Sequence, residues 1–334
     1  MRADRRWIPA AAAAALAALT PQTAMAQDTC PTLRWTTLGT AGGPVPTEDR
    51  AEPSNLLEAG ELDVLVDVGD GTVNQLARIG RDMGNVRHIF ISHLHWDHTG
   101  GLGAALGLRW MNEFPGEVTV YGPAGTAEVV AGIIASLGPP ARIGFGTGVL
   151  PPPPESRIRA VELADGQSLT IEGITIRAAR NNHFDQPLAE AQTEALSFRF
   201  EYAGRSITYT GDTGPDARVT ALAQGSDLLV SEVIALEPLI ASILTRRPDM
   251  PAPQMAAMRQ HLSTHHVDAA VVGEMARDAG VGHLVMTHLA VAGPLAASEA
   301  YLRDGVRSAY AGPVDLARDL ASFDVGCAGQ GAGQ

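Results

Sequence analysis

The order of strand-like and helix-like segments is the sequence feature that most constrains how this chain can fold. Branched and alternating apolar residues predict four strands in the first half, at residues 33–39, 63–69, 87–92 and 117–122. Helical stretches such as 72–80 and 127–137 separate some of these strands. In the second half strands are predicted at residues 173–179, at 195–212 with a turn inside, at 227–233 and at 283–289, with a helix at 266–280. Strands separated by helices indicate an α/β fold, and the antiparallel pair predicts two mixed sheets with the helices outside.

The first 26 residues have the composition of a secretory signal peptide. "MRADRRW" is basic, "IPAAAAAALAAL" is apolar, and "AMA" at 24–26 ends in small residues. The apolar stretch is shorter than the ~20 residues that a membrane-spanning helix needs. We therefore expect residues 1–26 to be cleaved, and residues 27–334 to form a single domain that is periplasmic or secreted, with no membrane association.

The charge of the chain is strongly acidic. Removal of residues 1–26 takes away three of the 24 basic residues and one of the 37 acidic residues, so the formal net charge moves from −13 to −15. Such a surface repels nucleic acid and anionic membranes. We therefore expect a small-molecule substrate and no nucleic-acid partner, while the sequence leaves a homodimer open.

The chain has two cysteines, Cys30 and Cys327, one near each end of the exported part. An exported protein meets a compartment in which disulfides form and persist. We expect the two residues to be bonded to each other, and the alternative is a pair of unrelated free thiols.

Two segments depart from the regular pattern. Residues 144–156, "GFGTGVLPPPPES", predict a rigid loop in solvent because of their glycines and prolines. Residues 235–260 combine an apolar helix with two proline breaks and three methionines. This second segment could be a substrate lid or a helix that packs on the core.

The six residues "HLHWDH" at 93–98 hold three histidines and an aspartate. His93 and His95 share one side of an extended backbone, and Asp97 and His98 fall where a second centre could be bound. Zinc takes imidazole nitrogens and carboxylate oxygens, and an open coordination position lets a bound water ionise near neutral pH. The motif alone gives only part of two ligand shells, and it could also be a histidine-rich polar turn. Further ligands are offered by His183 in "NNHFD", Asp212 in "YTGDTGPD" and His288 in "VMTHLA".

Taken together, these motifs resemble the metallo-β-lactamase superfamily, in its branch of ribonuclease Z, arylsulfatase and lactonase-like hydrolases. The resemblance covers nearly all of residues 27–334, through "LGTAGGPVPTEDR", "DVLVDVGDGTVNQL", "HLHWDH", "VYGPAGT", "TGDTG", "LLVSE" and "HLSTHHVDAAVVGEMARDAGVGHLVMTHL". It implies the αββα four-layer sandwich of that superfamily, with two mixed β-sheets flanked by helices.

The resemblance also implies roles for individual residues. The first metal would be held by His93, His95 and His183, the second by Asp97, His98 and His288, and Asp212 would bridge them. Two Zn²⁺ ions are expected, although the same ligands accept manganese or iron. A hydroxide between the metals would be the nucleophile, which Asp97 would also orient. His261 resembles the acid that protonates the leaving group, Glu232 resembles the carboxylate that orients this acid, and His265 and His266 are expected to be helix-cap or surface residues.

Within this branch, the sequence favours an exported dinuclear hydrolase of small esters, with arylsulfatase or phosphodiesterase-like activity. Opening of a lactone or a β-lactam is the alternative, and a metal-bound binding module without catalysis is an alternative of another class. Processing of tRNA 3′ ends is not expected. Residues 184–211 leave no room for the arm that ribonuclease Z carries between the corresponding ligands, and the acidic charge weighs the same way.

Overall fold

The computed structural model describes residues 30–185 and 193–327. The predicted signal peptide, residues 1–26, lies outside the described residues. Among the described residues, no helix combines the length and the apolar character needed to cross a bilayer.

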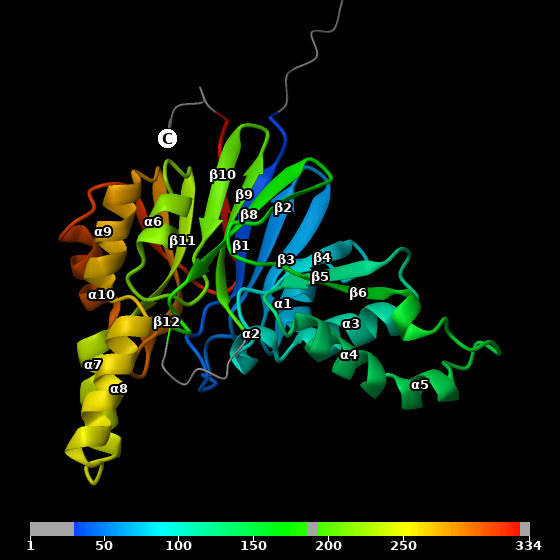
Figure 1. Ribbon diagram of the computed structural model, residues 1–334, viewed down its shortest axis with the longest axis horizontal. Coiled ribbons are helices and arrows are strands. Elements are labelled where there is room, and N and C mark those ends of the chain that lie inside the picture. Colours follow the sequence, from blue (N-terminus) through cyan, green and yellow to red (C-terminus); the bar gives the residue numbers. More distant parts are fainter. Residues whose placement is uncertain (1–29, 186–192, 328–334) are drawn as a thin grey trace, which may run out of the picture. The chain divides into compact units, whose positions relative to one another are not determined.

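Two seven-stranded sheets form the centre of the fold (Figure 1). In spatial order the first sheet consists of β14 (Ala321–Asp324), β1 (Leu33–Gly39), β2 (Ser54–Ala59), β3 (Leu62–Val68), β4 (Val86–Phe90), β5 (Val118–Gly122) and β6 (Ile158–Glu162). The second consists of β13 (Val314–Leu316), β12 (His283–Ala290), β11 (Leu228–Ile234), β10 (Arg205–Tyr209), β9 (Ala195–Tyr202), β8 (Ile174–Asn181) and β7 (Ser168–Ile171). Each sheet is antiparallel in one half and parallel in the other, so both are mixed, as predicted.

Helices cover the outer face of each sheet (Figure 1). The first half of the chain contributes α1 (Thr72–Arg78), α2 (Trp96–Thr99), α3 (Leu102–Met111), α4 (Thr126–Ser136), α5 (Gly138–Ile143) and the short 3₁₀ turn η1 (Pro154–Ser156). The second half contributes α6 (Ala217–Leu222), α7 (Leu236–Arg246), α8 (Ala252–His265), α9 (Ala269–Ala279), η2 (Leu295–Ala297) and α10 (Glu299–Arg307). The expected αββα sandwich is confirmed.

Three apolar clusters correspond to the three interfaces between these four layers. The cluster between the sheets is aromatic, and its largest fully buried side chains are Trp35, Phe90, Phe198, Phe200 and Tyr209. Phe90 meets Phe200 edge to face, with 5.5 Å between the ring centroids. A second cluster packs α9 and α10 on the second sheet, and a third packs α1, α3 and α4 on the first. Burial of apolar area against both faces of each sheet holds the layers together.

Most of the elements that the sequence predicts are present, with small shifts at their ends. The predicted strand at 63–69 is β3, which starts and ends one residue earlier, and the predicted helix at 266–280 begins only at Ala269. Strand β2 was not predicted, because "SNLLEA" is short and contains Asn55 and Glu58. Neighbouring strands on both sides bury all six of its residues, which compensates for this weak local pattern.

The two irregular segments and the cysteines have clear positions. Residues 144–156 form an exposed connection that ends in η1, as predicted, with Val149 and Leu150 in solvent. Residues 235–260 form α7 and most of α8, two helices that extend beyond the edge of the second sheet (Figure 1). Cys30 and Cys327 are both disulfide-bonded, which confirms the predicted disulfide.

Candidate metal centre

The sequence-predicted ligands converge at one edge of the sandwich, where strands of both sheets end. His93, His95, Asp97 and His98 follow β4 of the first sheet, and the last two lie in α2. His183 follows β8, Asp212 follows β10, and His288 lies near the end of β12, all in the second sheet. The carboxyl ends of strands are where α/β folds place ligands, because the loops there converge from several strands.

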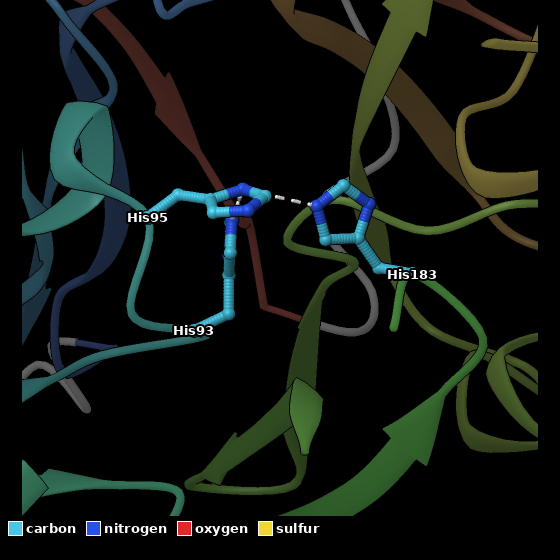
Figure 2. Close-up of side chains that lie close together, drawn as sticks. All are labelled: His93, His95 and His183. Carbon is cyan, nitrogen blue, oxygen red and sulfur yellow. Dashed lines mark hydrogen bonds between the residues drawn. The ribbon is translucent and has the colours of Figure 1, made fainter. Parts of the chain in front are cut away.

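His93, His95 and His183 form the first set of side chains. Their imidazole rings point toward one another from two different loops (Figure 2). Nδ1 of His95 lies 3.0 Å from Nε2 of His93 and 3.2 Å from Nε2 of His183. Nδ1 of His183 donates to the backbone carbonyl of His265 at 2.8 Å, which leaves Nε2 of His183 with a lone pair directed into the set.

Asp97, His98 and His288 form the second set. Oδ2 of Asp97 lies 3.6 Å from Nε2 of His98 and 3.6 Å from Nε2 of His288. All three residues are buried. His288 adopts a φ of 43°, a strained conformation for a residue with a side chain, which the surrounding β12 and β11 contacts maintain.

Asp212 stands between the two sets and turns one carboxylate oxygen toward each. Oδ1 lies 3.3 Å from Nε2 of both His98 and His288. Oδ2 lies 3.9 Å from Nε2 of His93 and 4.0 Å from Nε2 of His183. This is the arrangement that a carboxylate shared by two cations requires.

Three atoms where the second set meets Asp212 have no hydrogen-bond partner among the described residues. They are Nε2 of His98, Nε2 of His288 and Oδ1 of Asp212, and each is fully buried. Buried polar atoms without a partner cost free energy, so native structures rarely keep them unless an ion or water satisfies them. A divalent cation coordinated by imidazole and carboxylate groups accounts for all three.

The protonation of the first set also suits a cation. Burial lowers the pKa of His93 well below its ordinary value, lowers that of His95, and lowers the pKa of His183 to about 3. All three imidazoles are therefore neutral near pH 7, which is the form that binds metals. Burial opposes ionisation of Asp212, but His288 and His98 outweigh it and hold the pKa of Asp212 well below its ordinary value.

Asp67, which was not among the site residues predicted from the sequence, orients the second set. It is fully buried at the end of β3, and its carboxylate accepts hydrogen bonds from Nδ1 of His98 at 2.8 Å and from the Tyr209 hydroxyl at 2.7 Å. It also accepts from the backbone N–H and the hydroxyl of Ser92. Its contact with His98 directs Nε2 of that ring toward Asp212. The available signal was an aspartate inside the apolar run "VLVDVG".

The expected partner of Glu232 requires a correction. Oε2 of Glu232 lies 2.8 Å from Nδ1 of His266, not of His261 as expected, and Oε1 accepts from the backbone N–H of Thr213. His266 is not the cap or surface residue that the sequence suggested, because its side chain is only 13% exposed and lies 4.0 Å from Oδ2 of Asp212. His261 lies one to two turns back on α8, with its ring centroid 6.0 Å from that of His266.

The electrostatics of His266 suit a proton donor. Burial lowers its pKa, but the adjacent Glu232 carboxylate and its hydrogen bond outweigh burial, and the pKa rises to about 9. The ring is therefore an imidazolium near pH 7. Because Glu232 holds Nδ1, the Nε2–H is the proton that this imidazolium can still donate.

The centre opens to solvent on one side. His95 is exposed, and the adjacent Trp96 keeps 79% of its surface in solvent, whereas Asp97 and His98 are buried. The side of Asp97 is closed by Gly43, since a Cβ there would lie 2.0 Å from Oδ2 of Asp97. Of the residues 93–98, His95 and Trp96 are therefore the ones that form the exposed rim of the centre.

Comparison with known proteins agrees with this geometry. Residues 63–289 match the family model of the beta-lactamase superfamily domain. A ribonuclease Z of Mycobacterium avium is 35% identical over 298 residues, which are 87% of this chain and 97% of the relative. The metallo-beta-lactamase fold protein YhfI from Bacillus subtilis has a TM-score of 0.64 at 20% identity, covering 88% of this chain and 99% of that protein. Human tRNase Z, short form, has a TM-score of 0.58 at 20% identity, covering 88% and 100%.

The curated relatives contradict three expectations drawn from the sequence. A small-ester hydrolase of the arylsulfatase type is not supported. The exclusion of tRNA 3′-end processing and the exclusion of nucleic acid as a partner are also wrong, because curated relatives that align with nearly the whole chain are named ribonuclease Z. The expectation failed because net charge sums the whole surface and says little about one cleft. Residues 184–211 are too few to include the RNA-binding arm of ribonuclease Z, but the length of this interval does not exclude cleavage of RNA at the metal centre.

Replacement of Asp67 by asparagine tests the support that this residue gives to the centre. The amide of D67N cannot accept all four hydrogen bonds, so His98 loses its orientation and zinc affinity should fall about 10- to 100-fold. Competition for zinc with a chromophoric chelator measures the change. Asp63 of the same strand is also buried but lies against Arg81, and D63N should keep wild-type zinc affinity. Equal affinities for D67N and D63N would contradict the role of Asp67.

Proposed function

The chain belongs to the β-lactamase superfamily of metal-dependent hydrolases, and from that membership we propose that it cleaves phosphodiester bonds in RNA. The observation that carries the proposal is the position of Asp212, with one carboxylate oxygen before each of two histidine sets. Two cations held this way flank a single substrate group, which suits in-line displacement at phosphorus. The name of the curated relatives supports RNA as the molecule that carries this group.

We propose two Zn²⁺ ions for the centre, with the ligands divided as the sequence suggested. His93, His95 and His183 would hold the first ion, Asp97, His98 and His288 the second, and Asp212 both. Bound there, the cations supply Lewis acidity to a phosphoryl oxygen and lower the pKa of water to near neutral. The imidazole-rich donor set favours zinc over magnesium or calcium, which prefer oxygen ligands.

The proton that the leaving oxygen requires would come from His266. Its Nδ1 is occupied by Glu232 at 2.8 Å, so the ring is fixed and Nε2–H is the proton that remains to be given. Glu232 also keeps this imidazolium charged before the reaction. Asp97, a buried carboxylate of the second set, would also orient the attacking water.

The acidic chain can accept RNA if the contacts are local. The formal net charge is −13, but two divalent cations and the His266 imidazolium would bring positive charge to the point where the scissile phosphate lies. Binding that depends on a few contacts in the cleft needs no basic surface elsewhere. Its salt dependence would be shallow, since few counterions would be released.

Cleavage of a transfer-RNA precursor with a 3′ extension tests the proposed function. We expect the zinc-loaded protein to release the extension as one fragment, which denaturing gel electrophoresis resolves. The D212A variant, which loses the group shared by both sets, should be inactive. Intact precursor after incubation with zinc-loaded wild-type protein would refute the proposal.

Replacement of His266 by alanine tests the proton donor. Departure of a ribose oxygen needs a proton, so kcat on RNA should fall by ~10²–10⁴. p-Nitrophenolate leaves without a proton, so kcat for hydrolysis of bis(p-nitrophenyl) phosphate should change little. H261A is the comparison, and its kcat on both substrates should match that of the wild type, because His261 does not contact Glu232. Loss of RNA cleavage in H261A with full activity in H266A would return the role to His261.

We further propose that the protein is exported, to the periplasm or beyond. Support comes from the composition of residues 1–26 and from the bonded pair Cys30 and Cys327, which suits an oxidising compartment. Expressed in a Gram-negative host, the protein should be recovered from the periplasm with Gln27 as its N-terminus, as mass spectrometry of the N-terminal peptide would reveal. Recovery in the cytosol with the N-terminus intact would exclude export.

A further inference from the structure

Helices α7 (Leu236–Arg246) and α8 (Ala252–His265) form a hairpin that the metal centre does not explain. Both helices lie largely in solvent, and only Ile240 of α7 and His265 of α8 are buried. The ion pair of Glu237 with Arg259 joins the two helices. The hairpin leaves the fold after β11, which carries Glu232, and returns at His266 (Figure 1). Its two ends are therefore joined directly to the pair that would donate the proton.

A cavity of about 550 Å³ lies on the α7 side. It is lined by loop residues 42–43, 45–50 and 289–294, together with Leu239 and Arg246 of α7. Among the loop residues, Glu48, Asp49 and Arg50 carry charge, and Asp49 pairs with Arg50. The cavity adjoins the second histidine set, because Gly43 packs against Asp97 and Leu289 follows His288. Much of its wall is apolar.

A second cavity of about 530 Å³ lies on the α8 side. Its wall is about equally polar and apolar, and Asp185 also lines it. The cavity adjoins the first histidine set, because Asn182 precedes His183. The residues of α8 that line it are Ala257, Gln260, His261, Thr264 and His265.

The spacing of the lining residues shows that each helix turns one face to one cavity. Leu239 and Arg246 are seven residues apart, two turns of helix, and so share a face of α7. The α8 residues follow the spacing i, i+3, i+4, i+7 and i+8, which is also a single face. The hairpin therefore serves as a wall for two cavities that adjoin opposite halves of the metal centre.

Arg246 is a cation available for an anionic ligand. Arg259 pairs with Glu237, and Arg247 lies 3.9 Å from Asp249, but no carboxylate among the described residues pairs with Arg246. A guanidinium in such a position suits a phosphate, which it can contact through two N–H groups. Leu239 on the same face would pack against a ribose or a base.

We propose that the α7–α8 hairpin is the arm that holds RNA on the two sides of the scissile phosphodiester. Arg246 binds a phosphate of the strand in the first cavity, and Gln260 donates and accepts hydrogen bonds with a nucleotide in the second. This assignment rests on the proposed function and adds the residues that would select RNA over a small phosphodiester. Residues 184–211 need then contribute no arm, because the hairpin between Glu232 and His266 takes its place.

The test compares R246A, at the last residue of α7, with R247A, at the residue that follows the helix. Loss of a charge-assisted contact should raise KM for the transfer-RNA precursor about tenfold in R246A, with kcat nearly unchanged. The slope of log KM against log salt should fall by about one unit in R246A, as expected for one lost phosphate contact. R247A should match the wild type in KM for the precursor and in the salt slope. The wild type, R246A and R247A should hydrolyse bis(p-nitrophenyl) phosphate equally.

A second pair of variants tests the α8 face. Q260A should raise KM for the precursor roughly three- to tenfold through the loss of neutral hydrogen bonds, while Q254A, on an exposed turn outside the cavity, should not. Precursor cleavage with equal KM in R246A and R247A, or in Q260A and Q254A, would overturn the arm while the proposed function stands. Wild-type protein that hydrolyses the small phosphodiester but leaves the precursor intact would overturn both.

Discussion

The Asp212 carboxylate is the interaction on which the rest of the site depends. It is buried and it stands between four histidines, so neither its charge nor its unpaired Oδ1 is satisfied by water. The neighbouring groups come from both sheets, because His98 follows β4 in the chain and His288 lies in β12. Divalent cations at this point would join the two halves of the sandwich as well as supply chemistry, which couples metal binding to the stability of the fold.

Much of the fold follows from local sequence patterns, because each central strand is a compact apolar run between turns. The strands that escaped prediction, such as β2 and the three-residue β13, are set by their neighbours in the sheet instead. The residues of the candidate metal centre could be named from motifs because they lie at the end of a strand or within a few residues after it. Asp67 was not predicted as a site residue, because its role is to hold the ring of His98, which lies 31 positions later in the chain.

The histidine that contacts Glu232 shows where sequence reasoning lacks the needed information. The stretch from His261 to His266 contains three histidines, and which one meets Glu232 depends on where α8 ends. The helix continues through His265, and His266 is the first residue with an extended backbone, at φ −133° and ψ 165°. That change of direction turns its ring toward Glu232 and Asp212. A pattern of residues does not fix a helix end to one position, so the choice between His261 and His266 needed the structure.

Trp96 gives the metal centre an optical signal of its own. Of the other three tryptophans, Trp35 and Trp110 are buried and Trp7 lies in the segment before residue 30, so Trp96 is the exposed indole of the described residues. A dissolved quencher can contact the indole of Trp96 and reduce its fluorescence. It hardly affects the emission of the two buried indoles. The emission that such a quencher removes reports on the residue next to His95 and Asp97. Binding of a ligand at the metal centre can therefore be followed by fluorescence in the unlabelled protein, independently of catalytic turnover.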